Sequence, residues 1–286
     1  AFRVAARASE VLGTDPEARR RWEECLDRVP QIEWGWRDGE GWYALCKDWE
    51  AAWPDFASYM SHMRTSRWGC GGWVVFPGEH VDGDEPDGLA AVVRDIVSRI
   101  DLEKLPEETR KLGLFHGESM VMPPVRLGLR SHFPTLRKLL LSHTCASGQY
   151  NNYARGEGRY VQLPHMFSWR MLENQYFPIL AVSEMLLQSQ GGVIRLFPFW
   201  PREQAAAFSD FRARGAFSVS AEAHPGRGVT ASITSLRGNP CRIRIESGAE
   251  VSVASDGQAV PVQYTKDGRE LSFETRPGGF YALTIR

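Results

Sequence analysis

The chain has 286 residues, enough to bury one large hydrophobic core or two ordinary ones, and two domains are expected. Apolar residues make up 43% and charged residues 24%, a globular composition that argues against extensive disorder. The formal net charge of -1 supplies no basic excess for the phosphates of a nucleic acid or an anionic membrane, so neither is expected as a partner. No stretch approaches the about 20 apolar residues of a membrane span.

The cysteines are odd in number and never lie at CxxC spacing, which fits neither a disulfide framework nor a zinc site. Most are therefore predicted to be small core residues (Cys25, Cys46, Cys70, Cys145 and Cys241). The sequence also lacks P-loop, HExxH and GxSxG motifs, which excludes the usual nucleotide-binding, zinc-protease and serine-hydrolase sites. We expect no metal and no cofactor.

Helical periodicity dominates the first two thirds of the chain. The first predicted helix begins at Pro16, after Thr14 and Asp15 as candidate capping residues. Others are predicted over residues 88–100, 134–143 and 174–190, the last ending at Gly191-Gly192. In this last helix Ile179, Val182, Ser183, Leu186 and Leu187 are expected to face inward.

Three long segments rich in glycine, tryptophan or proline separate these helices and are interpreted as loops: residues 35–42, 67–87 and 147–169. Long loops between helices are uncommon unless they build a site, so these segments are expected to do so.

After Gly192 the hydrophobic period changes from 3.6 to 2, which is typical of half-buried strands. Turn dipeptides recur at the interval expected of an antiparallel sandwich, and Asp267-Gly268 predicts a hairpin. The predicted fold class is therefore α+β, with a helical domain over residues 1–192 and a small antiparallel β-sandwich domain over residues 193–286.

Three C-terminal segments, "SEMLLQSQGGVIRLFPFWP", "FRARGAFSVSAE" and "SITSLRGNPCRI", resemble glycoside hydrolase family 95, which contains inverting α-L-fucosidases. Upstream, "CKDWE", "SYMSHM" and "VFPGEHV" occur in the order of the family's corresponding segments. The resemblance implies that the helical domain is part of an (α/α)6-type barrel followed by the family's C-terminal β domain.

The resemblance also implies a catalytic residue. Glu173 lies where the family has its catalytic aspartate, so it is the candidate general base, and Asn174 and Gln175 are candidates to orient water or sugar hydroxyls. An acidic residue at a helix start is also a common structural feature, which is the simpler alternative. The family's general acid lies upstream of every matched segment. The chain is therefore expected to be a fragment that lacks the N-terminal half of the same polypeptide and is inactive alone.

The resemblance also implies two substrate contacts. Asp48 lies in the segment similar to the family's acidic-aromatic stretch, where a structural role at a helix edge is the alternative, and His62 lies in the segment similar to its histidine-rich one. Further contacts are predicted on loops where polar and aromatic side chains occur together: Trp68, Trp73, His165 and Trp169. For His62, a core or loop hydrogen bond is the alternative. Glu184, well inside its helix, is interpreted as a structural hydrogen-bonding or ion-pairing residue rather than a catalyst.

The resemblance thus implies an inverting glycoside hydrolase that acts on an oligosaccharide or glycan. A non-catalytic carbohydrate-binding module remains an alternative, as does a polysaccharide lyase or glycoside phosphorylase of similar barrel fold. For a lyase, Tyr160 and His165 are the nearest approach to a catalytic pair. The sequence does not fix the sugar, the linkage, the oligomeric state or the compartment, although the resemblance suggests a secreted or periplasmic enzyme with any signal peptide upstream.

Overall fold

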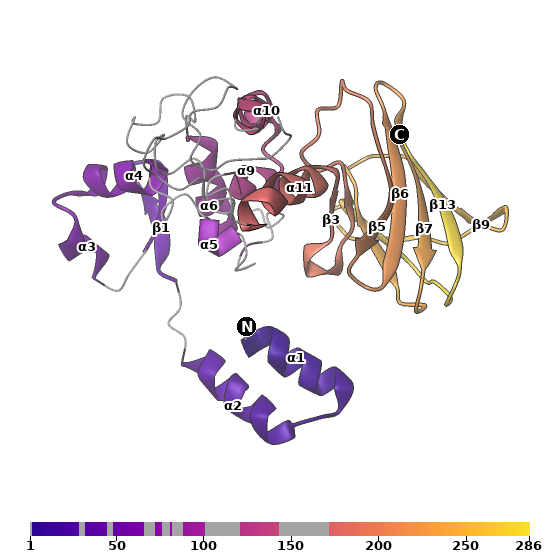
Figure 1. Cartoon of the computed structure of the whole chain (residues 1–286), viewed down its shortest axis with the longest axis horizontal. Coiled ribbons are helices and arrows are strands. Elements are labelled where there is room, and N and C mark those ends of the chain that lie inside the picture. Colours follow the sequence, from indigo (N-terminus) through magenta and orange to yellow (C-terminus); the bar gives the residue numbers. More distant parts are fainter. Residues whose placement is uncertain are drawn as a thin grey trace.

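The computed structural model describes residues 2–28, 32–44, 48–65, 72–75, 81, 88–100, 121–142 and 172–286. Figure 1 shows three parts in chain order: an N-terminal pair of helices, a group of helices with one small sheet, and a strand-rich C-terminal part. The protein is thus α+β with mostly antiparallel sheets.

The N-terminal pair consists of α1 (Phe2–Leu12), which sequence periodicity did not identify, and α2 (Pro16–Asp27). As predicted, α2 has a proline in its first turn, but the predicted side-chain cap is wrong. Asp15 adopts a left-handed backbone conformation with φ of 47°, and its side chain makes no capping hydrogen bond with any described residue. Ser9 Oγ instead donates to Thr14 O in the turn between the helices.

Residues 35–42, interpreted above as a loop, lie in a β-hairpin, which corrects that prediction. Strands β1 (Trp34–Arg37) and β2 (Glu40–Tyr43) pair antiparallel, with Trp36 opposite Gly41. Asp38 and Gly39 form the turn, with φ of 54° and 76°. Positive φ at both central residues is the requirement of a two-residue type I′ turn, for which Asp-Gly is a preferred sequence.

The hairpin packs on α6 (Gly88–Ser98), whose buried residues are Ala90, Val92, Val93, Ile96 and Val97. A Cβ at Gly41 would lie 3.0 Å from the Cα of Val92, so glycine allows this close approach. The Gly41 N–H donates to Asp95 Oδ2 across 3.0 Å.

The remaining described helices around α6 are α3 (Trp49–Ala52), α4 (Phe56–Thr65), α5 (Gly72–Val75), α9 (Met122–Arg126), η1 (Arg130–His132), α10 (Phe133–Ser142) and α11 (Leu172–Leu186). Their apolar side chains share one hydrophobic cluster with α6 and the hairpin. Its fully buried members include Tyr59, Met63, Val92, Ile96, Met122 and Leu136. These helices are too few to test the predicted (α/α)6 barrel, which stays a prediction.

The C-terminal strands form two larger sheets and a short ribbon. A six-stranded sheet has the order β10-β9-β13-β7-β6-β5, and a three-stranded sheet has the order β11-β12-β8. The strands of the two sheets are β5 (Ala206–Ala213), β6 (Phe217–His224), β7 (Gly228–Ser235), β8 (Cys241–Arg244), β9 (Val251–Ser255), β10 (Gln258–Ala259), β11 (Gln263–Tyr264), β12 (Glu270–Phe273) and β13 (Phe280–Ile285). The ribbon joins β3 (Leu187–Gln188) to β4 (Arg195–Leu196).

Side chains of both larger sheets meet in a second hydrophobic cluster, as in sandwich packing. On β6 the predicted alternation is confirmed, because Phe217, Val219 and Ala221 are buried while the residues between them are more exposed. The predicted hairpin around Asp267-Gly268 is also confirmed, since β11 and β12 pair antiparallel on either side of it. A domain boundary between residues 192 and 193 stays a prediction.

None of the helices in the described ranges has both the length and the apolar character required to cross a bilayer.

Candidate functional site

The candidate general base lies at the start of α11. This helix begins at Leu172, so Glu173 is its second residue and Asn174 and Gln175 follow in the same turn. The side chains of these three residues lie outside the described part of the structure. An acidic group in a first turn is stabilised as its anion by the unpaired N–H groups of the helix, which favours the proton-accepting form. The backbone position is compatible with a base.

The buried face of α11 differs from the prediction. Ile179 and Val182 are 62% and 42% exposed, whereas Ala181 and Met185 enter the first cluster. The inward assignment of Ile179 and Val182 is therefore wrong, although Leu186 is buried as expected. Apolar residues occur on every side of this helix, so their spacing could not select one face.

The C-terminal half of α11 is fixed to α9. Glu184 accepts a hydrogen bond from Arg126 Nη2 at 2.9 Å, and its other oxygen lies 2.8 Å from Arg126 Nε. Gln188 Nε2, just beyond the helix, donates to Val125 O and to Glu184 O. The predicted ion pairing of Glu184 is confirmed, and these contacts hold α11 in a defined direction.

His62 lies at the edge of an aromatic group on α3 and α4. Its ring centroid is 5.1 Å from that of Trp53, which makes an edge contact with Tyr59 at 4.9 Å. Tyr59 is fully buried, its hydroxyl donates to Tyr43 O, and its ring lies 4.4 Å from Trp49. Partial burial lowers the pKa of His62 below its usual value of 6.5, so the neutral imidazole is favoured.

Asp48 precedes α3 and has an exposed side chain that makes no capping hydrogen bond within the described part of the chain.

Trp34 and Trp36, which were not predicted as contacts, are 45% and 53% exposed on β1. The Asp38-Gly39 turn between aromatic strands was the sequence signal that could have placed them on a hairpin.

The other predicted contacts cannot be compared with the structure. Trp68, His165 and Trp169 lie outside the described residues, and so does the side chain of Trp73, whose backbone is in α5. The structure therefore leaves the predicted meeting of these residues with Glu173 untested. The described residues contain no group of three or more His, Cys, Asp or Glu side chains placed to hold a metal ion.

Comparison with known families gives one match, in the strand-rich part. Residues 188–283 match the model described as "Glycoside hydrolase family 95, C-terminal domain". The search of curated proteins gave no match.

Three of the solved structures with detectable similarity are glycoside hydrolases, each at 12% identity. The alignment with the catalytic domain of GH30 xylanase C from Talaromyces cellulolyticus covers 35% of this chain and 27% of the xylanase chain, with a TM-score of 0.24. The alignment with a protein named only as a glycoside hydrolase covers 59% of this chain and 32% of that protein, with a TM-score of 0.28. The alignment with a GH127 beta-L-arabinofuranosidase from Geobacillus stearothermophilus T6 covers 96% of this chain and 49% of the arabinofuranosidase chain, with a TM-score of 0.30. The chain thus spans less than half the length of each, and TM-scores this low do not define a shared fold.

The family assignment therefore depends on the strands from β3 to β13, whose segments carried the resemblance in the sequence. Residues 188–283 of this chain match the C-terminal domain of glycoside hydrolase family 95.

Proposed function

We propose that the chain is part of an inverting glycoside hydrolase acting on a terminal α-L-fucoside or a related sugar, with Glu173 as the general base. The observation that carries the proposal is the family match, which begins at residue 188, directly after the helix that has Glu173 in its first turn. The Arg126–Glu184 pair supports it, because a base must be held by a rigid element to keep its geometry.

In the proposed mechanism, the Glu173 carboxylate removes a proton from water as that water attacks the anomeric carbon. Inversion also needs a carboxylic acid about 6.5 to 9.5 Å away that protonates the departing oxygen. We place this acid in a segment of the same polypeptide outside the present residues. Glutamate reaches one methylene further than the aspartate of the family, so we expect a shifted water position or a related sugar in place of fucose.

The test compares Glu173→Gln with unaltered protein in the longest form of the polypeptide that hydrolyses an aryl α-L-fucoside. The substitution should lower kcat by a factor of about 100 or more while substrate binding persists. Proton NMR during early turnover should detect β-L-fucose as the first product. Glu203→Gln, which removes an exposed carboxylate from a turn, is the matched control. Unchanged kcat in Glu173→Gln, or α-L-fucose as the first product, would refute the assignment.

The exposed Trp34 and Trp36 favour a second candidate, a carbohydrate-binding surface without catalysis. Residues two apart on a strand face the same side, and indole rings match the apolar faces of sugars. If this candidate is right, replacing both tryptophans with alanine should abolish binding of oligosaccharides, and Glu173→Gln should have no effect on it.

A further inference from the structure

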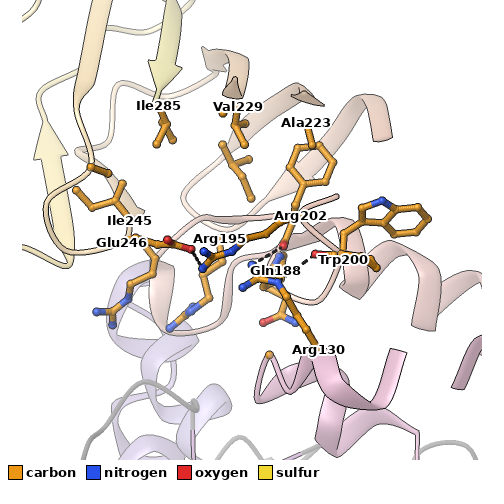
Figure 2. Close-up of a pocket in the computed structure, with 18 of the residues that line it drawn as sticks. Arg130, Gln188, Arg195, Trp200, Arg202, Ala223, Val229, Ile245, Glu246 and Ile285 are labelled. Atoms are coloured by element: carbon orange, nitrogen blue, oxygen red, sulfur yellow. Dashed lines mark hydrogen bonds and ion pairs between the residues drawn. The ribbon is translucent and has the colours of Figure 1, made fainter. Parts of the chain in front are cut away.

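A cavity of about 430 Å³ lies between the helices and the second cluster. Helix α9 and the turn before η1 form one wall, and the strand-rich part forms the others. Figure 2 shows the side chains of Val229 and Ile285 on one side of it and those of Arg130 and Arg195 on another. Its volume is in the range of small-molecule binding sites and is large enough for a ligand built on a single ring.

The lining is strongly basic. Six arginines and one glutamate contribute to it among the described residues: Arg126, Arg130, Arg195, Arg202, Arg244, Arg286 and Glu246. Even with the Arg126–Glu184 pair, cations exceed carboxylates around this space. Because neighbouring guanidinium groups repel one another in a partly desolvated site, an anion placed among them would relieve that repulsion.

The arginines are held in place by the fold. Arg130 Nε donates to Trp200 O at 3.0 Å and its Nη2 to Phe197 O at 3.2 Å. Arg195 is 5% exposed, and its Nη1 donates to the carbonyls of Gln190 and Val193. Such bonds to uncharged carbonyls hold the guanidinium groups of Arg130 and Arg195 in place at the cavity.

Arg202 and Glu246 form an adjustable edge of the cavity. Both side chains are more than half exposed, and they form an ion pair. Burial and the charge of Arg202 lower the pKa of Arg130, while Glu246 and Glu203 raise it, which places these four charges within electrostatic reach of one another. An exposed ion pair contributes little to stability, so an entering anion can take the place of Glu246.

We propose that this cavity binds a small organic anion, in which a carboxylate or sulfate group on a ring-sized body meets Arg130 and Arg202 while the body lies against Val229, Ile245 and Ile285. An acidic sugar and an aryl sulfate share this chemistry. Glu173 is not among the described residues that line the cavity, and the site does not depend on the proposed hydrolysis.

Titration calorimetry on the whole chain tests the site with two matched pairs of probes, glucuronate with glucose and phenyl sulfate with phenol. Within at least one pair, the affinity for the anion should be about tenfold or more above the affinity for its neutral partner, and added NaCl should lower the affinity for the anion. The pair whose anion binds more tightly identifies the ring that the cavity prefers. Equal binding of anion and neutral partner in both pairs, or no binding by any probe, overturns the proposal.

Variants then locate the binding. Arg202→Gln should lower the affinity for the anion by roughly tenfold, because it removes one charge-assisted hydrogen bond. Glu246→Gln should strengthen it several-fold, because it removes the competing carboxylate. Arg212→Gln is the matched control, since Arg212 is exposed on β5 and does not line the cavity. Thermal unfolding of each variant confirms that it is folded. Equal affinities in Arg202→Gln and Arg212→Gln would refute this site.

Discussion

Arg126 and Glu184, 58 residues apart, meet in a two-point ion pair whose side chains are only 9% and 15% exposed. The hydrogen bond from Arg126 Nη2 to Glu184 Oε1, together with the close ionic contact between Nε and Oε2, restricts both the distance and the orientation of the two side chains. The pair therefore determines how α11, and with it the candidate base, lies against α9.

Removing one partner of this pair should destabilise the protein. Glu184→Gln leaves Arg126 without that counter-charge in a nearly buried position, so the free energy of unfolding should fall by about 3 kcal/mol. Urea denaturation followed by circular dichroism measures the change. The exposed Glu203→Gln should shift it by less than about 0.5 kcal/mol. Equal effects of the two substitutions would show that the ion pair does not hold the helix.

Two nearby glycines provide a matched pair for steric strain. Gly226 and Gly228 both have positive φ, 71° and 94°, but a Cβ at Gly228 would lie 2.0 Å from Ile285 O, whereas one at Gly226 meets nothing within 4 Å. Gly226→Ala should cost roughly 1 kcal/mol, the usual left-handed penalty. Gly228→Ala should cost roughly 3 kcal/mol or more, because β7 and β13 must separate there. Thermal unfolding distinguishes them, and similar melting temperatures would contradict the clash.

Cys241 should be almost unreactive in the folded protein. Burial raises the pKa of its thiol from 9.0 to about 12, so at about pH 8 the thiolate fraction falls by roughly a thousandfold. Cys25 on α2 is only half-buried and should be alkylated much faster. Iodoacetamide labelling with peptide mass spectrometry measures both rates, and denaturation should bring them together. Rapid labelling of Cys241 in folded protein would contradict its burial.

His62 should make stability depend on pH. Its pKa is lowered in the fold, so the unfolded chain binds the proton more readily as pH falls through about 6.5, and stability is lost in that window. NMR titration should give a lower pKa for His62 in the folded protein than in urea. His62→Gln should reduce the loss of stability between about pH 7 and about pH 5. A folded pKa at or above the value in urea would contradict this prediction.

The strand-rich part was largely predictable, because β6 alternates strictly and Asp267-Gly268 has the chemistry of a tight turn. The β1–β2 hairpin was missed, since its glycines and tryptophans suggested a loop although Asp38-Gly39 specifies a turn. In α11 the sequence located the helix but not its buried face, because apolar residues such as Ile179 occur on more than one side.

The candidate site was less predictable for a physical reason. Local spacing determines which residues share a helix face, but it does not determine which distant loops meet. The basic cavity shows the same limit, because Arg130 and Arg202 come from separate segments and share no local pattern. Only their positions in the folded chain bring their charges to one space.

Trp200 is half-buried and packs against both hydrophobic clusters, with its ring 5.3 Å from Phe133 of α10 and its carbonyl bonded to Arg130. A side chain shared in this way links the melting of helices and strands, since neither group can loosen without exposing the same indole. Heating should therefore produce one cooperative transition shared by the first hydrophobic cluster and the strands β3 to β13, with no intermediate in which the strands alone remain ordered.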